Sequence, residues 1–188
     1  MYLVVGLGNP GPRYSLTRHN AGFIFLDFLA EGLSAKFQEK RSYEALYTEV
    51  EFAGTRLCLL KPQTFMNLSG RSVAAVLRNT EITPDKILVF HDEVEIPAGD
   101  LRIKMGGGDA GHNGLKSIRD SIGTGDFYRF RMGVGRPSNP QMDLAAYVLE
   151  RYAKSEQELL MSQLENAEAC LEIFINEGLQ KAQMKAST

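Results

Sequence analysis

The chain contains three histidines, His19, His91 and His112, and each lies where a side chain could take part in catalysis. His19 ends a loop before a predicted helix, His91 ends a predicted central strand, and His112 lies in the segment GGGDAGHNG. A neutral imidazole is well suited to accept a proton near neutral pH. Structural roles are the alternatives. For His91 we favour a ring that only hydrogen-bonds backbone, whereas His19 remains open and His112 could support the glycine-rich loop.

Carboxylate and amide side chains accompany these histidines. Asp92 follows the predicted central strand, where its carboxylate could accept a hydrogen bond from an imidazole and hold that ring as a base. Asn9, Asn67 and Asn113 could donate to a developing oxyanion or position a water molecule. Turn positions are the alternatives, and Asn67 also fits a helix N-cap. No G-x-S-x-G nucleophile motif is present, and Ser69 is a candidate only by default, so the set favours attack by an activated water.

The first glycine-rich segment, Gly6-Leu7-Gly8-Asn9-Pro10-Gly11, fits the pattern G-x-G-x-x-G. A dinucleotide site requires a helix that opens within this pattern and an acidic residue at the end of the following strand. Here Pro12 keeps Gly11 out of helical geometry. The acidic residue at the right distance, Asp27, falls inside a predicted helix. We therefore do not expect a dinucleotide cofactor.

A metal site is conceivable around the end of the predicted central strand. Its candidate ligands are His91, Asp92, Glu93 and His112. They lack a recognised ligand spacing such as H-E-x-x-H. The two cysteines, Cys58 and Cys170, have no metal-type spacing either, and we expect two buried thiols. The sequence therefore predicts neither a metal nor a disulfide.

Composition favours an ordinary globular protein. The 188 residues are 44% hydrophobic and 23% charged, which suits one domain spanning 1–188 with a polar, frayed tail from about residue 179. No apolar run could span a bilayer and no export signal is evident, so we expect no membrane association and a cytoplasmic location. The net charge is −2, but residues 100–136 carry seven basic and four acidic side chains. This local excess suits a polyanionic partner, although a mixed solvated surface is the alternative.

The order of predicted elements indicates an α/β protein. Strands are expected at 2–5, 43–52, 55–60, 86–90, 101–104 and 127–134, and helices at 21–33, 67–79, 115–122, 141–149 and 155–177, with a loop at 36–41 and Asn20 as an N-cap. Alternating strands and helices with an inserted hairpin predict a single-domain, three-layer fold. A mixed twisted sheet would have helices on both faces. Loops at the carboxyl ends of its strands would converge on one crevice.

Four segments occur in an order that resembles bacterial peptidyl-tRNA hydrolases. They are VGLGNPGPRYSLTRHNAGF, LLKPQTFMNLSGRSV, FHDEVEIPAGDLRIKMGGGDAGHNGLKSI and FYRFRMGVGRP. The resemblance covers nearly the whole chain. It implies a monomer that needs no metal or organic cofactor. The implied substrate is peptidyl-tRNA, and the implied reaction is hydrolysis of the ester that joins the peptide to the 3′-terminal ribose.

The same resemblance assigns roles to individual residues. His19 matches the general base, Asp92 the carboxylate that keeps it basic, and Asn9 a residue that helps to distinguish blocked from free aminoacyl-tRNA. The remaining matches concern binding. Asn67 and Asn113 would position substrate and water, Tyr14 and Phe65 would lie near the tRNA terminus and the peptide, and Lys104 and Arg131 would contact the tRNA body. The glycine-rich loop departs from the family pattern at Asp109 and Ala110.

Besides a metal-dependent hydrolase, two other functions remain as alternatives. One is a non-enzymatic RNA-binding or ribosome-associated module on the same fold, against which the pair of His19 and Asp92 argues. The other is a nucleotide-dependent oxidoreductase, for which saturable NAD binding would be required. A metallohydrolase would lose activity on chelation and regain it with added metal.

Overall fold

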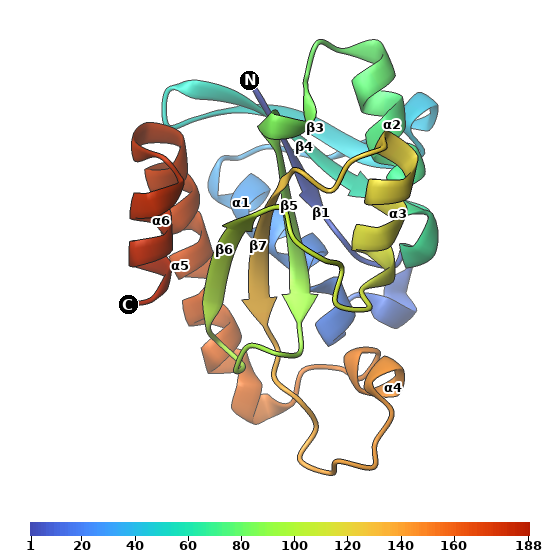
Figure 1. Cartoon of the computed structure of the whole chain (residues 1–188), viewed down its shortest axis with the longest axis vertical. Helices are drawn as coiled ribbons and strands as arrows, with labels where there is room; N and C mark the ends of the chain where they lie inside the picture. The colour runs from blue at the N-terminus through green and yellow to red at the C-terminus, as the bar shows by residue number, and fades with distance from the viewer.

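A seven-stranded mixed sheet forms the centre of the protein in a computed structural model that describes residues 1–188 (Figure 1). The strands are β1 (Tyr2–Gly6), β2 (Gln38–Lys40), β3 (Ala45–Phe52), β4 (Thr55–Pro62), β5 (Ile87–Glu93), β6 (Leu101–Met105) and β7 (Tyr128–Gly133). The helices are α1 (Ala21–Gly32), α2 (Ser69–Asn79), α3 (Asn113–Ile122), α4 (Leu144–Val148), α5 (Lys154–Glu177) and α6 (Leu179–Ala186). The strand order is β2-β3-β4-β1-β5-β7-β6. The predicted α/β fold with a mixed sheet is therefore confirmed.

The middle of the sheet is parallel. β1 pairs with β4 and β5 in parallel, and β5 pairs in parallel with β7, whereas the outer pairs are antiparallel. Parallel strands end at the same edge of a sheet, and the arrowheads of β5 and β7 point toward the side where α4 lies (Figure 1). Loops that follow these strands meet at that edge, which is where an open α/β sheet binds its ligands.

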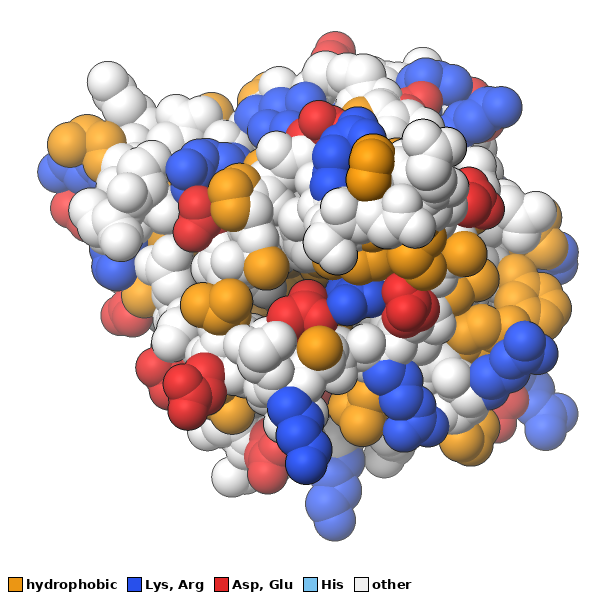
Figure 2. Space-filling model, turned by 90° about the horizontal axis from the view of Figure 1, so that it is seen from below, with side chains coloured by type: hydrophobic (Ala, Val, Ile, Leu, Met, Phe, Trp, Pro, Cys, Tyr) orange, Lys and Arg blue, Asp and Glu red, His pale blue; other side chains and the backbone are white.

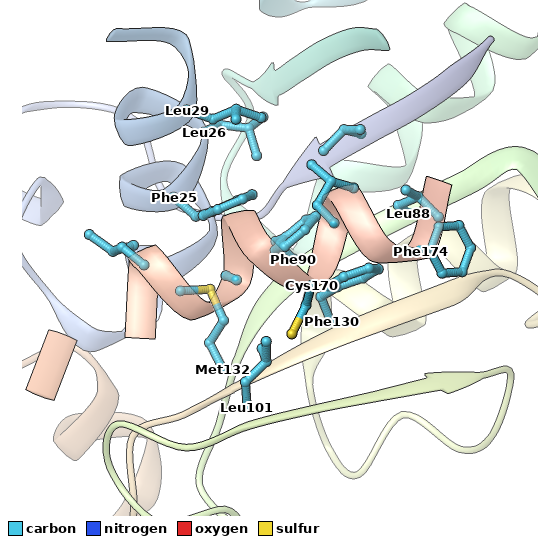
Figure 3. Close-up of a cluster of buried hydrophobic side chains, with 14 of the residues drawn as sticks. Phe25, Leu26, Leu29, Leu88, Phe90, Leu101, Phe130, Met132, Cys170 and Phe174 are labelled. Carbon is cyan, nitrogen blue, oxygen red and sulfur yellow. The ribbon is translucent and has the colours of Figure 1, made fainter. Parts of the chain in front are cut away.

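Helices cover both faces of the sheet, as predicted. On one face, α1, α5 and α6 contribute to a core in which the ring of Phe90 stacks on Phe25 at 4.2 Å and on Phe130 at 4.3 Å (Figure 3). On the other face, α2 and α3 bury Val76 and Ile118 against the sheet. The two cores fix both surfaces of β5, so the residues at its end have little freedom to move. No helix is both long and apolar enough to cross a membrane.

β5 is longer than the sequence predicts. We expected an apolar run to Phe90 with His91 at the end of the strand, but the parallel ladder with β7 continues to the pair Glu93–Gly133. Every residue of β5 is buried, including His91 and Asp92. Hydrophobic periodicity gives no signal for polar residues that stay in a ladder, so the end of the strand was misplaced. As a result Asp92 is a rigid part of the sheet and not an exposed turn residue.

Two peripheral predictions were wrong. Residues 38–40, expected in a loop, form the short edge strand β2, whose side chains are exposed and which pairs with β3. The tail was expected to fray but forms α6, in which Ala182 and Ala186 are buried in the core. Gly178, at a φ of 94°, lets the chain turn between α5 and α6. Small apolar residues spaced four apart gave α6 a buried face despite its polar composition.

Helix starts also differ from the predictions. Asn20 occupies the N-cap position of α1 but makes no capping hydrogen bond. Asn67 lies in a single helical turn, Met66–Leu68, and does not cap α2. The helix expected at 141–149 is reduced to α4. The side chains of Asn20 and Asn67 are consequently available for other contacts.

The first glycine-rich segment lets α1 pack close to the sheet, because a Cβ on Gly6 would lie 2.5 Å from the carbonyl oxygen of Gly22 in α1. A Cβ on Gly22 would lie 2.2 Å from the carbonyl oxygen of Phe90, so α1 can approach β5 only because Gly22 has no side chain. Asp27 lies within α1 and pairs with Lys61 at 2.6 Å. The close packing of α1 on β5 places His19, just before α1, next to the end of β5.

Candidate active site

A cavity of about 480 Å³ opens at the carboxyl ends of β1 and β5. The predicted site residues that line it are Asn9, His19, Phe65, Asn67, Asp92, His112 and Asn113. They come from four separate segments of the chain, which the fold brings together as expected. Figure 2 views the molecule from this side and shows hydrophobic, basic and acidic side chains intermixed over the surface.

His19 and Asp92 form a direct hydrogen bond. His19 lies in a single helical turn, Arg18–Asn20, and its Nδ1 is 2.9 Å and 3.1 Å from the two carboxylate oxygens of Asp92. Because a carboxylate only accepts, Nδ1 carries the proton and donates it. The other ring nitrogen, Nε2, is then an unprotonated acceptor, as a general base requires.

His112 contacts the same carboxylate from the glycine-rich loop. Its Nδ1 accepts hydrogen bonds from the backbone N–H groups of Gly114 and Leu115, which makes His112 the N-cap of α3. The proton of the neutral ring must therefore be on Nε2, which donates to Asp92 Oδ1 at 2.8 Å. This arrangement fixes the tautomer of His112. It also accounts for the support of the glycine-rich loop that the sequence suggested as a structural role for this residue.

These hydrogen bonds disfavour a metal ion at this cluster. The ligand atoms of His19, Asp92 and His112 lie within 4.8 Å of one another, as a metal site would require. A metal on Nε2 of His112 would need the ring proton on Nδ1, where two backbone N–H groups already donate. Glu93 and His91, the other ligands considered from the sequence, are not part of this cluster. The donor set suits proton transfer better than metal binding.

Burial and hydrogen bonding shift the pKa values of the pair in opposite directions. Burial alone would lower the pKa of His19, but the charge of Asp92 and the hydrogen bond to it raise that pKa above its ordinary value of 6.5. Burial alone would raise the pKa of Asp92, but the two imidazoles lower it well below its usual range. Asp92 therefore stays ionised and makes His19 a stronger base.

His91 does not line the cavity. Its Nδ1 donates to the carbonyl oxygen of Asp92 at 2.8 Å, and the ring is buried. Burial, assisted by the neighbouring His112, lowers the pKa of His91 to about 3, so the ring is neutral. The structural interpretation that we favoured for His91 is confirmed.

Hydrogen bonds hold both the side chain and the backbone of Asn9. Its side-chain oxygen accepts from the N–H of Met66 at 2.8 Å, which leaves the amide NH₂ as the group that faces the cavity. The side chain of Asn20 accepts from the backbone N–H of Asn9 at 2.8 Å and donates to its carbonyl oxygen at 2.9 Å. The sequence did not reveal this function of Asn20, because an asparagine before a helix is typical of an N-cap.

Three further residues of the cavity are free to contact a ligand. Asn67 and Asn113 are exposed, and neither side-chain amide has a hydrogen-bond partner within the protein. Phe65 is 59% exposed, a large fraction for an aromatic side chain. An exposed aromatic ring beside free amide groups offers stacking and hydrogen bonding together.

One wall of the cavity was missed by sequence reasoning. It is formed by apolar side chains in and just after α4: Leu144, Ala145, Val148 and Leu149. The spacing of Leu144 and Val148 is typical of one helix face and could have indicated a buried stripe. Nothing in the sequence indicated that this stripe faces the histidines.

Lys104, Arg131 and Tyr14 lie outside the cavity. Lys104 and Arg131, on the neighbouring strands β6 and β7, alternate with core residues and so share the sheet face opposite α5. Arg131 pairs with Glu93 at 3.2 Å. Burial and the charges of the neighbouring arginines lower the pKa of Lys104. Tyr14 ends the helical turn Pro12–Tyr14, which precedes the turn that carries His19.

Several basic side chains of segment 100–136 are paired or buried, so fewer are available to a polyanionic partner than the composition indicates. Arg119 pairs with Asp109, and Arg136 pairs with Glu95. Arg129 is fully buried and donates to the carbonyl oxygens of Gly108 and Gly125, so it holds the glycine-rich loop in place. Lys104 and Lys116 form no ion pair. The mixed-surface interpretation therefore describes most of this segment.

Ala110 in the glycine-rich loop adopts a backbone conformation that favours glycine. Its φ is 49°, in the left-handed region. We expect Ala110→Gly to raise the free energy of unfolding by about 0.5–1 kcal/mol, because relief of strain exceeds the entropy that glycine adds to the unfolded chain. Urea unfolding measures this difference. Ala169→Gly, within α5, is the matched control and should lower stability by about 0.5–1 kcal/mol. Destabilisation by Ala110→Gly would contradict the strain assigned to this position.

Comparison with known proteins identifies the family. The sequence model of the family described as peptidyl-tRNA hydrolase matches residues 3–188. The peptidyl-tRNA hydrolase of Frankia alni is 48% identical over 182 residues, covering 97% of this chain and 91% of that protein. That of Geotalea uraniireducens is 48% identical over 179 residues, covering 95% and 92%.

A solved structure agrees with this result. The crystal structure of peptidyl-tRNA hydrolase from Acinetobacter baumannii superposes with a TM-score of 0.92 at 34% sequence identity. The similarity covers 99% of this chain and 94% of that one. Sequence and fold are thus shared along nearly the full length, and the chain belongs to the peptidyl-tRNA hydrolase family of carboxylic ester hydrolases.

Proposed function

We propose that this protein hydrolyses the ester bond between a peptide, or an N-blocked aminoacyl group, and the 3′ ribose of tRNA. The reaction would recycle tRNA from prematurely released peptidyl-tRNA. The observation that carries the proposal is the contact between His19 and an ionised, buried Asp92 at the wall of a cavity with free amide groups. Family membership supports the substrate class.

The reaction begins with a water molecule on Nε2 of His19. The unprotonated nitrogen takes a proton from the water while the water oxygen forms a bond to the ester carbonyl carbon. Asp92 stabilises the imidazolium through the hydrogen bond at Nδ1. The C–O bond to the ribose then breaks, and the imidazolium returns the proton to the 3′ oxygen. The products are a free carboxylic acid and the 3′ hydroxyl of tRNA.

Side-chain amides would stabilise the charge that develops on the carbonyl oxygen. The NH₂ group of Asn9 is held toward the cavity by the hydrogen bond of its oxygen to Met66. Asn67 and Asn113 would position the water and the substrate from the opposite loops. Neutral donors of this kind stabilise an oxyanion without altering the charge balance of the site. In addition to this electrostatic role, Asn9 would help to discriminate against an unblocked α-amino group.

The rest of the substrate would lie along the surrounding surface. The apolar wall of α4 and the ring of Phe65 would hold the acyl end, and Tyr14 would lie near the tRNA terminus. Peptide backbone atoms would make the polar contacts, since nascent peptides vary in sequence. We assign the whole chain, 1–188, to one catalytic domain that acts as a monomer in the cytoplasm without metal or organic cofactor.

Cleavage of blocked and unblocked aminoacyl-tRNA tests the proposed function. The protein would be incubated with N-acetyl-aminoacyl-tRNA and with the same tRNA bearing a free α-amino group, before and after exhaustive chelation. We expect ester cleavage of the blocked form only, and an unchanged rate after chelation. Binding without cleavage would favour a non-enzymatic RNA-binding module. Loss of activity that added metal restores would favour a metallohydrolase.

Lys104 and Arg131 would contact the phosphates of the tRNA body. We expect Lys104→Ala and Arg131→Ala to weaken tRNA binding and to reduce the salt-dependence slope by about one unit each at most, because each removes one phosphate contact. The effect of Arg131→Ala should be the smaller one, because Glu93 already neutralises part of its charge. Affinity measured across a salt series gives the slope. Lys181→Ala, on α6 at the other face of the sheet, is the control and should change nothing. An unchanged salt-dependence slope for Lys104→Ala would show that the tRNA binds to a surface that does not include Lys104.

A further inference from the structure

Arg18 precedes His19 and is a buried charged side chain with several hydrogen-bond partners. Its side chain is 8% exposed. Nε and Nη2 donate to the two carboxylate oxygens of Glu156 at 3.1 Å and 2.6 Å, and Nη1 donates to the carbonyl oxygen of Tyr147 at 3.0 Å. The guanidinium also lies 3.9 Å from the centre of the Tyr147 ring. A buried charge is costly unless it is paired and hydrogen-bonded, and here it is both.

The charge states of this pair are fixed. Burial alone would lower the pKa of Arg18, but Glu156 raises it above its ordinary value. Burial alone would raise the pKa of Glu156, but its hydrogen bonds to Arg18 and to the backbone of Ala153 lower it below its usual range. Both groups therefore remain ionised. The contact is a permanent ion pair with the two-pronged geometry that only arginine can provide.

Backbone bonds join the same two segments. The N–H of Arg18 donates to the carbonyl oxygen of Glu150 at 3.1 Å, and the N–H of Tyr152 donates to that of Leu16 at 3.1 Å. Thr17 and Arg151 form an isolated β-bridge between these bonds. The loop that carries His19 is thus connected to residues more than 125 positions away in the sequence.

This connection includes the apolar wall of the cavity. Tyr147 belongs to α4, and its hydroxyl donates to the carbonyl oxygen of Val134 at 2.9 Å. Neighbouring residues of the same helix, Leu144 and Val148, line the cavity that contains His19. Arg18 itself does not line the cavity. Its contacts connect the turn that carries His19 with the helix that carries the apolar wall.

We propose that Arg18 is a positioning residue, which acts through its contacts with Glu156 and Tyr147 to set the distance between His19 and the apolar wall of α4. This inference rests on the proposed function, because the distance matters only if an acyl group held against α4 must meet a water molecule on His19. A displacement of ~1 Å between catalytic group and substrate can reduce a rate by about a hundredfold. Correct placement of the wall would therefore affect kcat more than the affinity for tRNA.

Arg18→Lys tests the proposal, because lysine keeps the charge but loses the paired hydrogen bonds and the planar contact with Tyr147. We expect kcat for N-acetyl-aminoacyl-tRNA to fall by about 10–100-fold, with KM and tRNA affinity changed by less than about threefold. Glu156→Gln is a milder second variant, since its amide oxygen can still accept from Ala153 and from Arg18. We expect it to lower kcat by about 3–10-fold. If Arg18→Lys does not fold, the loss of kcat expected for Glu156→Gln tests the proposal instead, and an unchanged kcat for that variant would contradict it.

A matched control separates positioning from general stability. Lys61 is also buried, pairs with Asp27 at 2.6 Å, lies 5.1 Å from the ring of Phe23, and does not line the cavity. Lys61→Met should reduce stability in urea and leave kcat within about twofold when assayed fully folded. A kcat loss for Arg18→Lys no greater than that for Lys61→Met would overturn the proposal.

A double variant tests whether Arg18 acts through His19. Once His19 is replaced by alanine, Arg18→Lys should cause no further loss of rate, because residues that act as a unit are not additive. Independent, additive losses would overturn the positioning role. The failure of the proposed function has a different signature: wild-type protein would not cleave the blocked substrate at all. Cleavage by wild type and by a folded Arg18→Lys variant at equal rates would refute this inference alone.

Discussion

His19→Ala should lower kcat for hydrolysis of N-blocked aminoacyl-tRNA by about 10²–10⁴-fold. In the proposed mechanism Nε2 of His19 accepts the proton of the water molecule, and the cluster of His19, Asp92 and His112 offers no second unprotonated ring nitrogen for that role. His112 holds its proton on Nε2 and uses Nδ1 to cap α3, so it cannot take over. Steady-state and single-turnover cleavage assays measure the loss.

The same variant should keep its fold and its affinity for tRNA. Asp92 retains its hydrogen bond to His112 after His19 is removed. In the proposed function the tRNA body contacts Lys104 and Arg131, which lie outside the cavity. Urea unfolding and direct tRNA binding are therefore the controls for this variant. Activity of His19→Ala close to that of wild type would remove the central part of the account.

Asp92→Asn should reduce the rate by a comparable factor, about 10²–10⁴-fold, although the shape of the site is preserved. The carboxylate accepts from His112 at Oδ1 and from His19 mainly at Oδ2. An asparagine can satisfy His112 with its oxygen, which turns its NH₂ group toward Nδ1 of His19. The ring would then have to accept at Nδ1 and carry its proton on Nε2, where a base must be unprotonated.

The pH profile separates this explanation from simple loss of structure. In the wild type, Asp92 raises the pKa of His19 above 6.5, so kcat/KM should rise with pH and level off above that value. Without the carboxylate, burial dominates and lowers the pKa of the ring. The residual activity of Asp92→Asn should therefore have its acid limb at lower pH than wild type. An acid limb that stays in place would show that Asp92 does not set the basicity of His19.

Much of the fold followed from the sequence because the central elements have strong hydrophobic signals. The presence of strands around Val4 and Val89 and of the long helix α5 was predicted correctly for this reason. Errors occurred where packing overrides local pattern. The polar residues at the end of β5 stay in the ladder because β7 pairs with them, and α6 forms because two alanines find room on the core. Neither partner could be identified from local sequence.

For the candidate site, the sequence indicated the chemistry of the side chains but not the long-range contacts that orient them. Chemistry indicated that Asp92 could hold an imidazole as a base, and the topology of the sheet indicated that the loops carrying the three histidines could meet. The resemblance to peptidyl-tRNA hydrolases then singled out His19 as the partner of Asp92. The long-range contacts could not be predicted. The tautomer of His112 depends on the backbone of α3, and the pairing of Arg18 with Glu156 spans most of the chain. An asparagine at an apparent N-cap, Asn20, turned out to hold Asn9.

A pH titration of the His19 ring, set beside the pH dependence of kcat/KM, tests the central claim most directly. Ring nitrogen chemical shifts in the free protein report the pKa of His19 and show which nitrogen carries the proton. We predict a pKa above 6.5, a neutral ring protonated at Nδ1, and an acid limb of kcat/KM at the same pH. A ring that remains neutral throughout the pH range in which the rate falls, or one protonated at Nε2 in the active form, would contradict the account.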